Sequence, residues 1–125
     1  MFKITRIYSD NKGESYFEDI EVPLNDDGEI GFLSDRVPVE SIIFRTVKPE
    51  YDYDFHTAPQ KQYVVLLDGE IEIETSLGEK RIFGGGDILL LEDTHGKGHK
   101  TRNVLNIERR SIFISLASTR TPSVH

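Results

Sequence analysis

Apolar and polar residues alternate along most of this chain, in short segments that end at turn-forming residues. Such alternation predicts β-strands, because successive side chains of a strand point to opposite faces of a sheet. The predicted strands cover residues 2–8, 15–24, 41–47, 51–56, 62–67, 70–75, 80–83, 88–91, 99–104 and 111–116. Many short strands separated by turns predict an all-β sandwich or barrel of antiparallel strands.

Two of these segments, 62–67 (QYVVLL) and 88–91 (ILLL), have apolar residues at both odd and even positions. This pattern predicts strands that are buried on both sides. A single barrel interior covers only one side, so these strands have more apolar surface than one interior can bury. The predicted core contains Val64, Leu66, Ile71, Ile73, Leu89 and Phe113.

Composition agrees with an all-β fold, because the chain has 13 Ile and 8 Val but only 2 Ala. A length of 125 residues predicts one domain over 1–125, with 118–125 as a flexible tail. The absence of Cys excludes disulfides and thiolate metal sites. A net charge of −7 argues against nucleic acid as a partner, and no apolar run is long enough to span a membrane. We therefore expect a cytoplasmic protein.

The segment before Gly69 resembles the first motif of the cupin superfamily, a group of small jelly-roll barrels. In this motif, G-x5-H-x-H-x3-E-x6-G, His56 matches the first His and Gly69 the last Gly. Ala58 and Gln62 stand at the positions of the second His and the Glu, and Glu50 stands at the first Gly. The resemblance implies a cupin-type jelly-roll barrel of antiparallel strands.

The segment after Gly86 resembles the second cupin motif, G-x5-P-x-G-x2-H-x3-N. Gly86 opens it, Glu92 replaces the Pro, and a loop longer by two residues brings His99 and Asn103 to the His and Asn positions. The steps FH, AP, QYVV and EDTHGKGH make the chain similar to short, poorly characterised single-domain cupins. That likeness brings no reaction with it, but it implies a homodimer.

Residues 56, 58 and 62 share parity, so their side chains can point into one barrel interior if the strand direction is kept. His56, Gln62 and His99 are therefore expected to converge on one small-molecule site. The same three residues are the candidate ligands of a divalent transition metal, and His95 could add a fourth. Two imidazoles and a neutral amide form an incomplete ligand set, which predicts weak or absent metal binding.

Basic residues gather near the second motif: residues 95–125 carry six basic and one acidic side chain. Lys97 lies between two glycines, whose exposed backbone amides could accept an anion, or which could serve only the turn geometry. Lys97 and Arg102 are candidates to hold an anionic group. Asn103 and Tyr53 are further candidate ligand-binding residues, and Tyr51, Tyr63 and Phe55 could line the mouth of the site.

Three functions remain open from the sequence. The first is an isomerase or lyase that acts on a small anionic or sugar-derived molecule, with His56 and His99 as catalytic acid and base. The second is a metal-dependent oxygenase or isomerase. The third is a non-catalytic module that binds or senses a small ligand. The fold alone does not choose between them, since barrels of this kind host unrelated functions.

Overall fold

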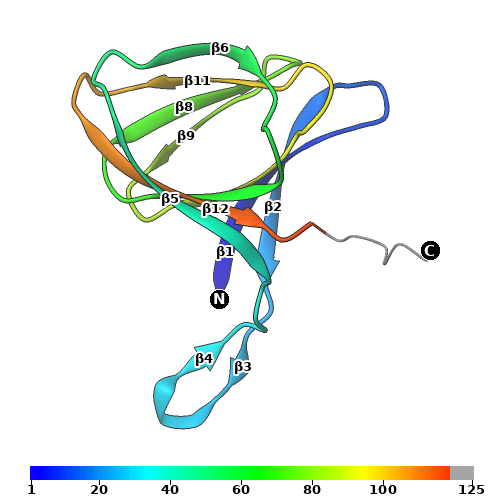
Figure 1. Ribbon diagram of the computed structural model, residues 1–125, viewed down its shortest axis with the longest axis vertical. Coiled ribbons are helices and arrows are strands. Elements are labelled where there is room, and N and C mark those ends of the chain that lie inside the picture. Colours follow the sequence, from blue (N-terminus) through cyan, green and yellow to red (C-terminus); the bar gives the residue numbers. More distant parts are fainter. Residues whose placement is uncertain (119–125) are drawn as a thin grey trace.

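Two β-sheets face each other in this computed structural model, which describes residues 1–118 (Figure 1). The six-stranded sheet has the order β2 (Ser15–Val22), β1 (Phe2–Ser9), β10 (Ile88–Glu92), β7 (Gln62–Leu66), β12 (Arg109–Leu116) and β5 (Val39–Val47). The four-stranded sheet has the order β6 (Asp52–His56), β11 (His99–Asn103), β8 (Glu70–Thr75) and β9 (Lys80–Gly84). Of the tail expected over 118–125, residues 119–125 lie outside the described part of the chain.

The predicted all-β class is confirmed, and all of the predicted strands are present with ends that move by a few residues. Neighbouring strands pair antiparallel, with one exception: β1 and β10 run parallel, with Thr5 opposite Leu89. In the part of the chain that is described, no helix has the length and apolar character needed to cross a bilayer.

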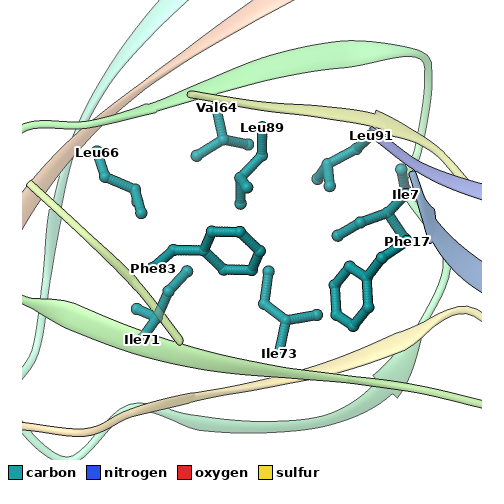
Figure 2. Close-up of a cluster of buried hydrophobic side chains, with 10 residues drawn as sticks. Ile7, Phe17, Val64, Leu66, Ile71, Ile73, Phe83, Leu89 and Leu91 are labelled. Carbon is teal, nitrogen blue, oxygen red and sulfur yellow. The ribbon is translucent and has the colours of Figure 1, made fainter. Parts of the chain in front are cut away.

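The hydrophobic core lies between the two sheets (Figure 2). Ile71, Ile73 and Phe83 of the four-stranded sheet face Val64, Leu66, Leu89 and Leu91 of the six-stranded sheet, with Ile7 and Phe17 at one end. Five of the six predicted core residues are buried, as expected. The exception is Phe113, which is only partly buried because it lines the cavity described below.

The outer face of the six-stranded sheet carries two cross-strand rows of apolar side chains. Strand pairing places Phe44, Ile112, Val65 and Ile88 in one row and Ile42, Ile114, Tyr63 and Leu90 in the other. Phe44 is 76% exposed. The prediction that 62–67 and 88–91 are buried on both sides is therefore wrong for the single chain, because only their inner faces meet the core.

A small arm projects from the body between β2 and β5 (Figure 1). It consists of β3 (Asn25–Asp26), a 3₁₀ turn over Gly28–Ile30 and β4 (Phe32–Leu33), and β3 pairs with β4 alone. The sequence pattern indicated only turns and irregular backbone here, because two-residue strands are too short to show alternation.

Candidate functional site

A cavity of about 620 Å³ opens beside the core, between the two sheets. This volume is in the range of sites that bind small molecules. Its apolar side is formed by core residues that include Val64, Leu66, Ile71, Ile73 and Leu89. Its polar side is formed by Arg45, Tyr51, Tyr53, His56, Gln62, His99 and Arg109. The cavity thus joins an apolar wall to a set of groups that can bind charge or move protons.

His56, Gln62 and His99 all line this cavity, as the sequence predicted. His56 ends β6 and lies opposite His99, which begins β11, and the centres of their rings are 4.6 Å apart. Gln62 begins β7 on the facing sheet and is buried. Strand parity is not the reason for their convergence, because the chain leaves β6 at His56 and crosses to the other sheet before Gln62.

Gly98 allows the two histidines to approach so closely. Its φ of +72° is a left-handed conformation, and a Cβ added there would collide with the carbonyl oxygen of His56. Gly96 similarly lies against the backbone of Gly13, and the amide of Lys97 donates to the Gly13 carbonyl at 2.9 Å. The glycines of this loop therefore provide close backbone packing. The Lys97 amide is not free to bind an anion, because it already donates a hydrogen bond to Gly13.

Asp93 is a functional candidate that the sequence analysis missed. Its carboxylate is fully buried, and Oδ2 accepts a hydrogen bond from Nδ1 of His99 at 2.5 Å. The other oxygen, Oδ1, is buried without a hydrogen-bond partner in the described residues. A carboxylate on Nδ1 fixes the tautomer of an imidazole and stabilises its positive charge. His99 lines the cavity, and because its Nδ1 is bonded to Asp93, Nε2 is the nitrogen left to accept a proton.

His56 is held in a different way. Its Nδ1 donates to the backbone carbonyl of Asp54 at 2.9 Å, which leaves the lone pair on Nε2 free in the neutral ring. Burial, and to a smaller extent the neighbouring His99, lowers the pKa of His56 below its ordinary value of 6.5. At neutral pH this ring is therefore uncharged and able to accept a proton or a hydrogen bond.

Two tyrosines extend the polar wall from His56. The rings of Tyr53 and His56 are nearly perpendicular, with 4.3 Å between their centres, and Tyr51 stacks on Tyr53 with 6.1 Å between centres. Both line the cavity, as expected. Phe55 and Tyr63 do not line it: Phe55 is exposed, and Tyr63 lies on the outer face of β7.

The candidate anion-binding residues from the sequence lie outside the cavity lining. Lys97 is exposed and its Nζ pairs with Glu14 at 2.5 Å, whereas Arg102 pairs with Glu72 at 3.0 Å. Although both residues are near the second motif in sequence, they lie outside the cavity, since Lys97 pairs with Glu14 just before β2 and Arg102 pairs with Glu72 of β8. The expectation that Lys97 and Arg102 hold an anionic group in the cavity is therefore wrong.

Asn103 also lies outside the cavity lining, but it is hydrogen-bonded to Arg109, which lines the cavity. Its Nδ2 donates to the carbonyl oxygens of Lys48 and Pro49 at 3.0 and 2.9 Å. Its Oδ1 accepts from Nε of Arg109 at 2.7 Å. Asn103 is therefore a positioning residue for Arg109 and not a direct ligand-binding residue.

Arg45 and Arg109 are the cations that do line the cavity, and the sequence analysis missed both. Arg45 lies in β5, between Phe44 and Thr46, and Arg109 begins β12. Arg109 is only 3% exposed. Arg45 lies within the strand predicted over 41–47, but the inward and outward faces of that strand could not be told apart from sequence, and Arg109 lies outside the strand predicted over 111–116.

The donor set is poor for a metal. Residues 1–118 contain no group of three or more His, Asp or Glu side chains placed to share an ion. Asp93 is occupied by Nδ1 of His99, His95 is exposed and contacts the carbonyl of Asp10, and Ala58 offers only a methyl group. Two imidazoles and the Gln62 amide remain, whereas zinc-type sites use three or four strong protein ligands. These residues do not fit a tightly held divalent ion.

Comparison with known proteins addresses the fold. No protein-family model matches the sequence, and no curated protein is significantly similar to it. Among solved structures, a sugar phosphate isomerase of the cupin superfamily from Silicibacter pomeroyi matches with a TM-score of 0.51 and 14% identity, over 94% of this chain and 72% of that one.

Two further structures match less well. A cupin domain from Bordetella pertussis has a TM-score of 0.48 and 17% identity over 66% of this chain and 91% of its own. A putative ethanolamine utilization protein from Salmonella typhimurium has a TM-score of 0.44 and 16% identity over 93% and 96%. The facing antiparallel sheets and the match over nearly the whole described chain show that this protein has the cupin fold, as its two motifs indicated.

Proposed function

We propose that this protein is an enzyme that binds a small hydroxylated anion in its cavity and isomerises it by acid–base catalysis. The observation that carries the proposal is the pair of imidazoles at 4.6 Å, one of them backed by the buried carboxylate of Asp93. Two proton acceptors in a partly apolar cavity are an arrangement suited to proton transfer.

The two histidines have distinct roles in this proposal. Nε2 of His99 takes the proton from a carbon next to a carbonyl group, and the electron pair of the broken C–H bond forms an enediolate. Asp93 stabilises the positive charge that appears on His99. His99 then returns the proton to the neighbouring carbon, so that the carbonyl group has moved by one position.

His56 handles the second proton of the same reaction. Moving a carbonyl group between adjacent carbons also requires a hydroxyl proton to move from one oxygen to the other. Neutral His56, with Nε2 free, accepts this proton and donates it to the second oxygen. The lowered pKa of His56 supports this role, because the ring is neutral at the start of the reaction and releases the proton readily.

One solved structure with the same fold is described as a sugar phosphate isomerase, which agrees with this class of reaction. At 14% identity that agreement concerns the fold, and the fold hosts many functions. The proposal therefore depends on the histidines and Asp93 of this chain.

The test is hydrogen exchange in D₂O, followed by proton NMR, with a panel of aldose phosphates, ketose phosphates and sugar acids. We expect loss of the carbon-bound proton signal, and formation of the isomer, for at least one compound. His99→Asn and His56→Asn should each slow the reaction by about 100-fold or more. His95→Asn is the matched control, since His95 is exposed and outside the cavity.

The remaining outcomes overturn the proposal in favour of an alternative. Binding of a panel compound without exchange would assign the chain as a ligand-binding or sensing module. Activity that disappears with a chelator and returns with zinc or nickel would assign a metal-dependent enzyme, against the poor donor set described above. Equal activity in the parent and both cavity histidine variants would show that the reaction occurs elsewhere.

A further inference from the structure

Arg109 is a buried charge without an acidic partner in the described residues. Its single side-chain hydrogen bond there is from Nε to the neutral amide oxygen of Asn103. None of the ion pairs in residues 1–118 includes it. Buried charges are normally paired, because removing an unpaired ion from water is strongly unfavourable. The guanidinium therefore lacks the anion that its location requires.

The local structure holds Arg109 in this position. Gly69 ends the turn before β8, and a Cβ added there would lie 2.8 Å from Cβ and 3.2 Å from Cδ of Arg109. The side chain of Arg109 thus packs along the bare backbone of this turn. Its Nε is fixed by Asn103, whose amide is itself bound to two backbone carbonyls. An arginine held at both stem and head is pre-organised, which favours binding over a mobile surface arginine.

Arg45 brings a second positive charge to the same place. Its Cζ is 4.9 Å from the centres of the Tyr51 and Phe113 rings, and Cζ of Arg109 is 5.5 Å from the Tyr51 ring. Both arginines line the cavity, and no Asp or Glu of the described residues does so. Burial, with a smaller contribution from Arg45, lowers the pKa of Arg109. Like charges repel each other, and a bound anion relieves that repulsion.

We infer that Arg45 and Arg109 bind an oxyanion, a carboxylate or phosphate group, of the molecule that occupies the cavity. Each guanidinium offers paired N–H donors that match two oxygens of such a group. This inference deepens the proposed function, since the oxyanion would belong to the molecule on which His56 and His99 act. It also replaces Lys97 and Arg102, which are paired with acidic side chains at the surface.

The experiment uses inorganic phosphate and acetate as probes, because they carry the two oxyanions without the rest of a substrate. Each is titrated into the full-length protein while the arginine Nε–H signals are followed by NMR. We expect saturable shifts of the Arg109 signal. Arg45→Met should weaken binding of the better probe at least tenfold. Arg102→Met is the matched control, because it removes an exposed arginine outside the cavity, and it should leave the affinity unchanged.

Arg109→Met is the stronger test of the site but changes a buried residue, so its fold is checked first by circular dichroism. If it does not fold, Arg45→Met, at a partly exposed position, still decides the question. Tighter binding of phosphate would indicate a phosphorylated ligand, and tighter binding of acetate a carboxylated one. Absence of saturable binding of both probes, or equal weakening by Arg102→Met and Arg45→Met, would overturn the inference.

The outcome is separable from that of the proposed function. His99→Asn should abolish hydrogen exchange but retain phosphate or acetate binding. If the parent binds the anion and isomerises no compound of the panel, the oxyanion site stands and the isomerase proposal fails. If it isomerises a panel compound with an unchanged KM in Arg45→Met, the isomerase stands and the oxyanion site fails.

Discussion

Replacing Gly98 by Ala tests whether the backbone at this residue sets the distance between the two histidines. The added methyl group would collide with the carbonyl oxygen and carbon of His56 and would lie 2.8 Å from the amide nitrogen of Thr57. These are backbone atoms at the end of β6, so they cannot turn aside as a side chain could. We expect β6 and β11 to separate at this end, which moves His56 away from His99.

The size of the effect follows from two contributions. Gly98 has φ of +72°, and a non-glycine residue in the left-handed region costs about 1–2 kcal/mol. Forcing a methyl group into a filled space adds about 1–3 kcal/mol. Gly78→Ala provides the first contribution alone, because Gly78 has φ of +91° with no atom within 4 Å of an added Cβ. Gly98→Ala should therefore destabilise the protein by about 1–3 kcal/mol more than Gly78→Ala.

The assay is urea denaturation of the parent and both variants, combined with NMR spectra of the histidine rings. We expect the His56 and His99 signals to shift in Gly98→Ala and to keep their positions in Gly78→Ala. Because both changes remove a glycine, their effects on the unfolded chain are similar and cancel in the comparison. Equal losses of stability, with unchanged histidine signals in both variants, would refute the idea that Gly98 permits the approach of the two strands.

Four further predictions concern the core, the pH dependence, the outer face and the metal. Leu66→Ala removes a fully buried side chain and should cost about 2–5 kcal/mol in urea denaturation; a loss under about 0.5 kcal/mol would mean that the facing of β7 is wrong. The pKa of His56 is lower in the folded chain, so the unfolded chain binds more protons as the pH falls below 6.5. Stability should then decline on acidification, less so in His56→Gln, and an identical decline in both proteins by thermal melting would contradict this. Phe44→Glu should convert the expected homodimer to a monomer in light-scattering measurements, whereas a parent that is already monomeric would exclude a dimer through this face. Gln62→Glu with Ala58→His should bind nickel or zinc far more tightly than the parent in calorimetric titrations, and equal affinities would show that the natural residues already make a competent metal site.

The strands could be predicted because the information for them is local. Alternation in segments such as 70–75 and a turn such as that at Gly69 depend on neighbours in sequence, and both are present as expected. The arm between β2 and β5 was not predicted, since its strands consist of two residues each. The parallel pairing of β1 with β10 was also missed, because it joins segments about 80 residues apart.

The candidate site was predicted in part. His56, Gln62 and His99 were found from motif spacing, which reflects the fold of the whole family and so contains information on distant contacts. Asp93 and Arg109 were missed because their roles depend on which side chains they meet across the cavity. A carboxylate next to a turn is most often solvated, and only the fold reveals that this one is buried behind an imidazole.

The arm at residues 25–33 has a practical consequence for protein engineering. The strand pairing of the two large sheets does not depend on the arm, because β2 pairs with β1 and β5 pairs with β12, while β3 and β4 pair only with each other. Exposed turns of this kind tolerate added sequence well. A fluorophore or affinity peptide inserted at Gly28, where an added Cβ meets no atom within 4 Å, would report on the protein without entering the cavity between the two sheets.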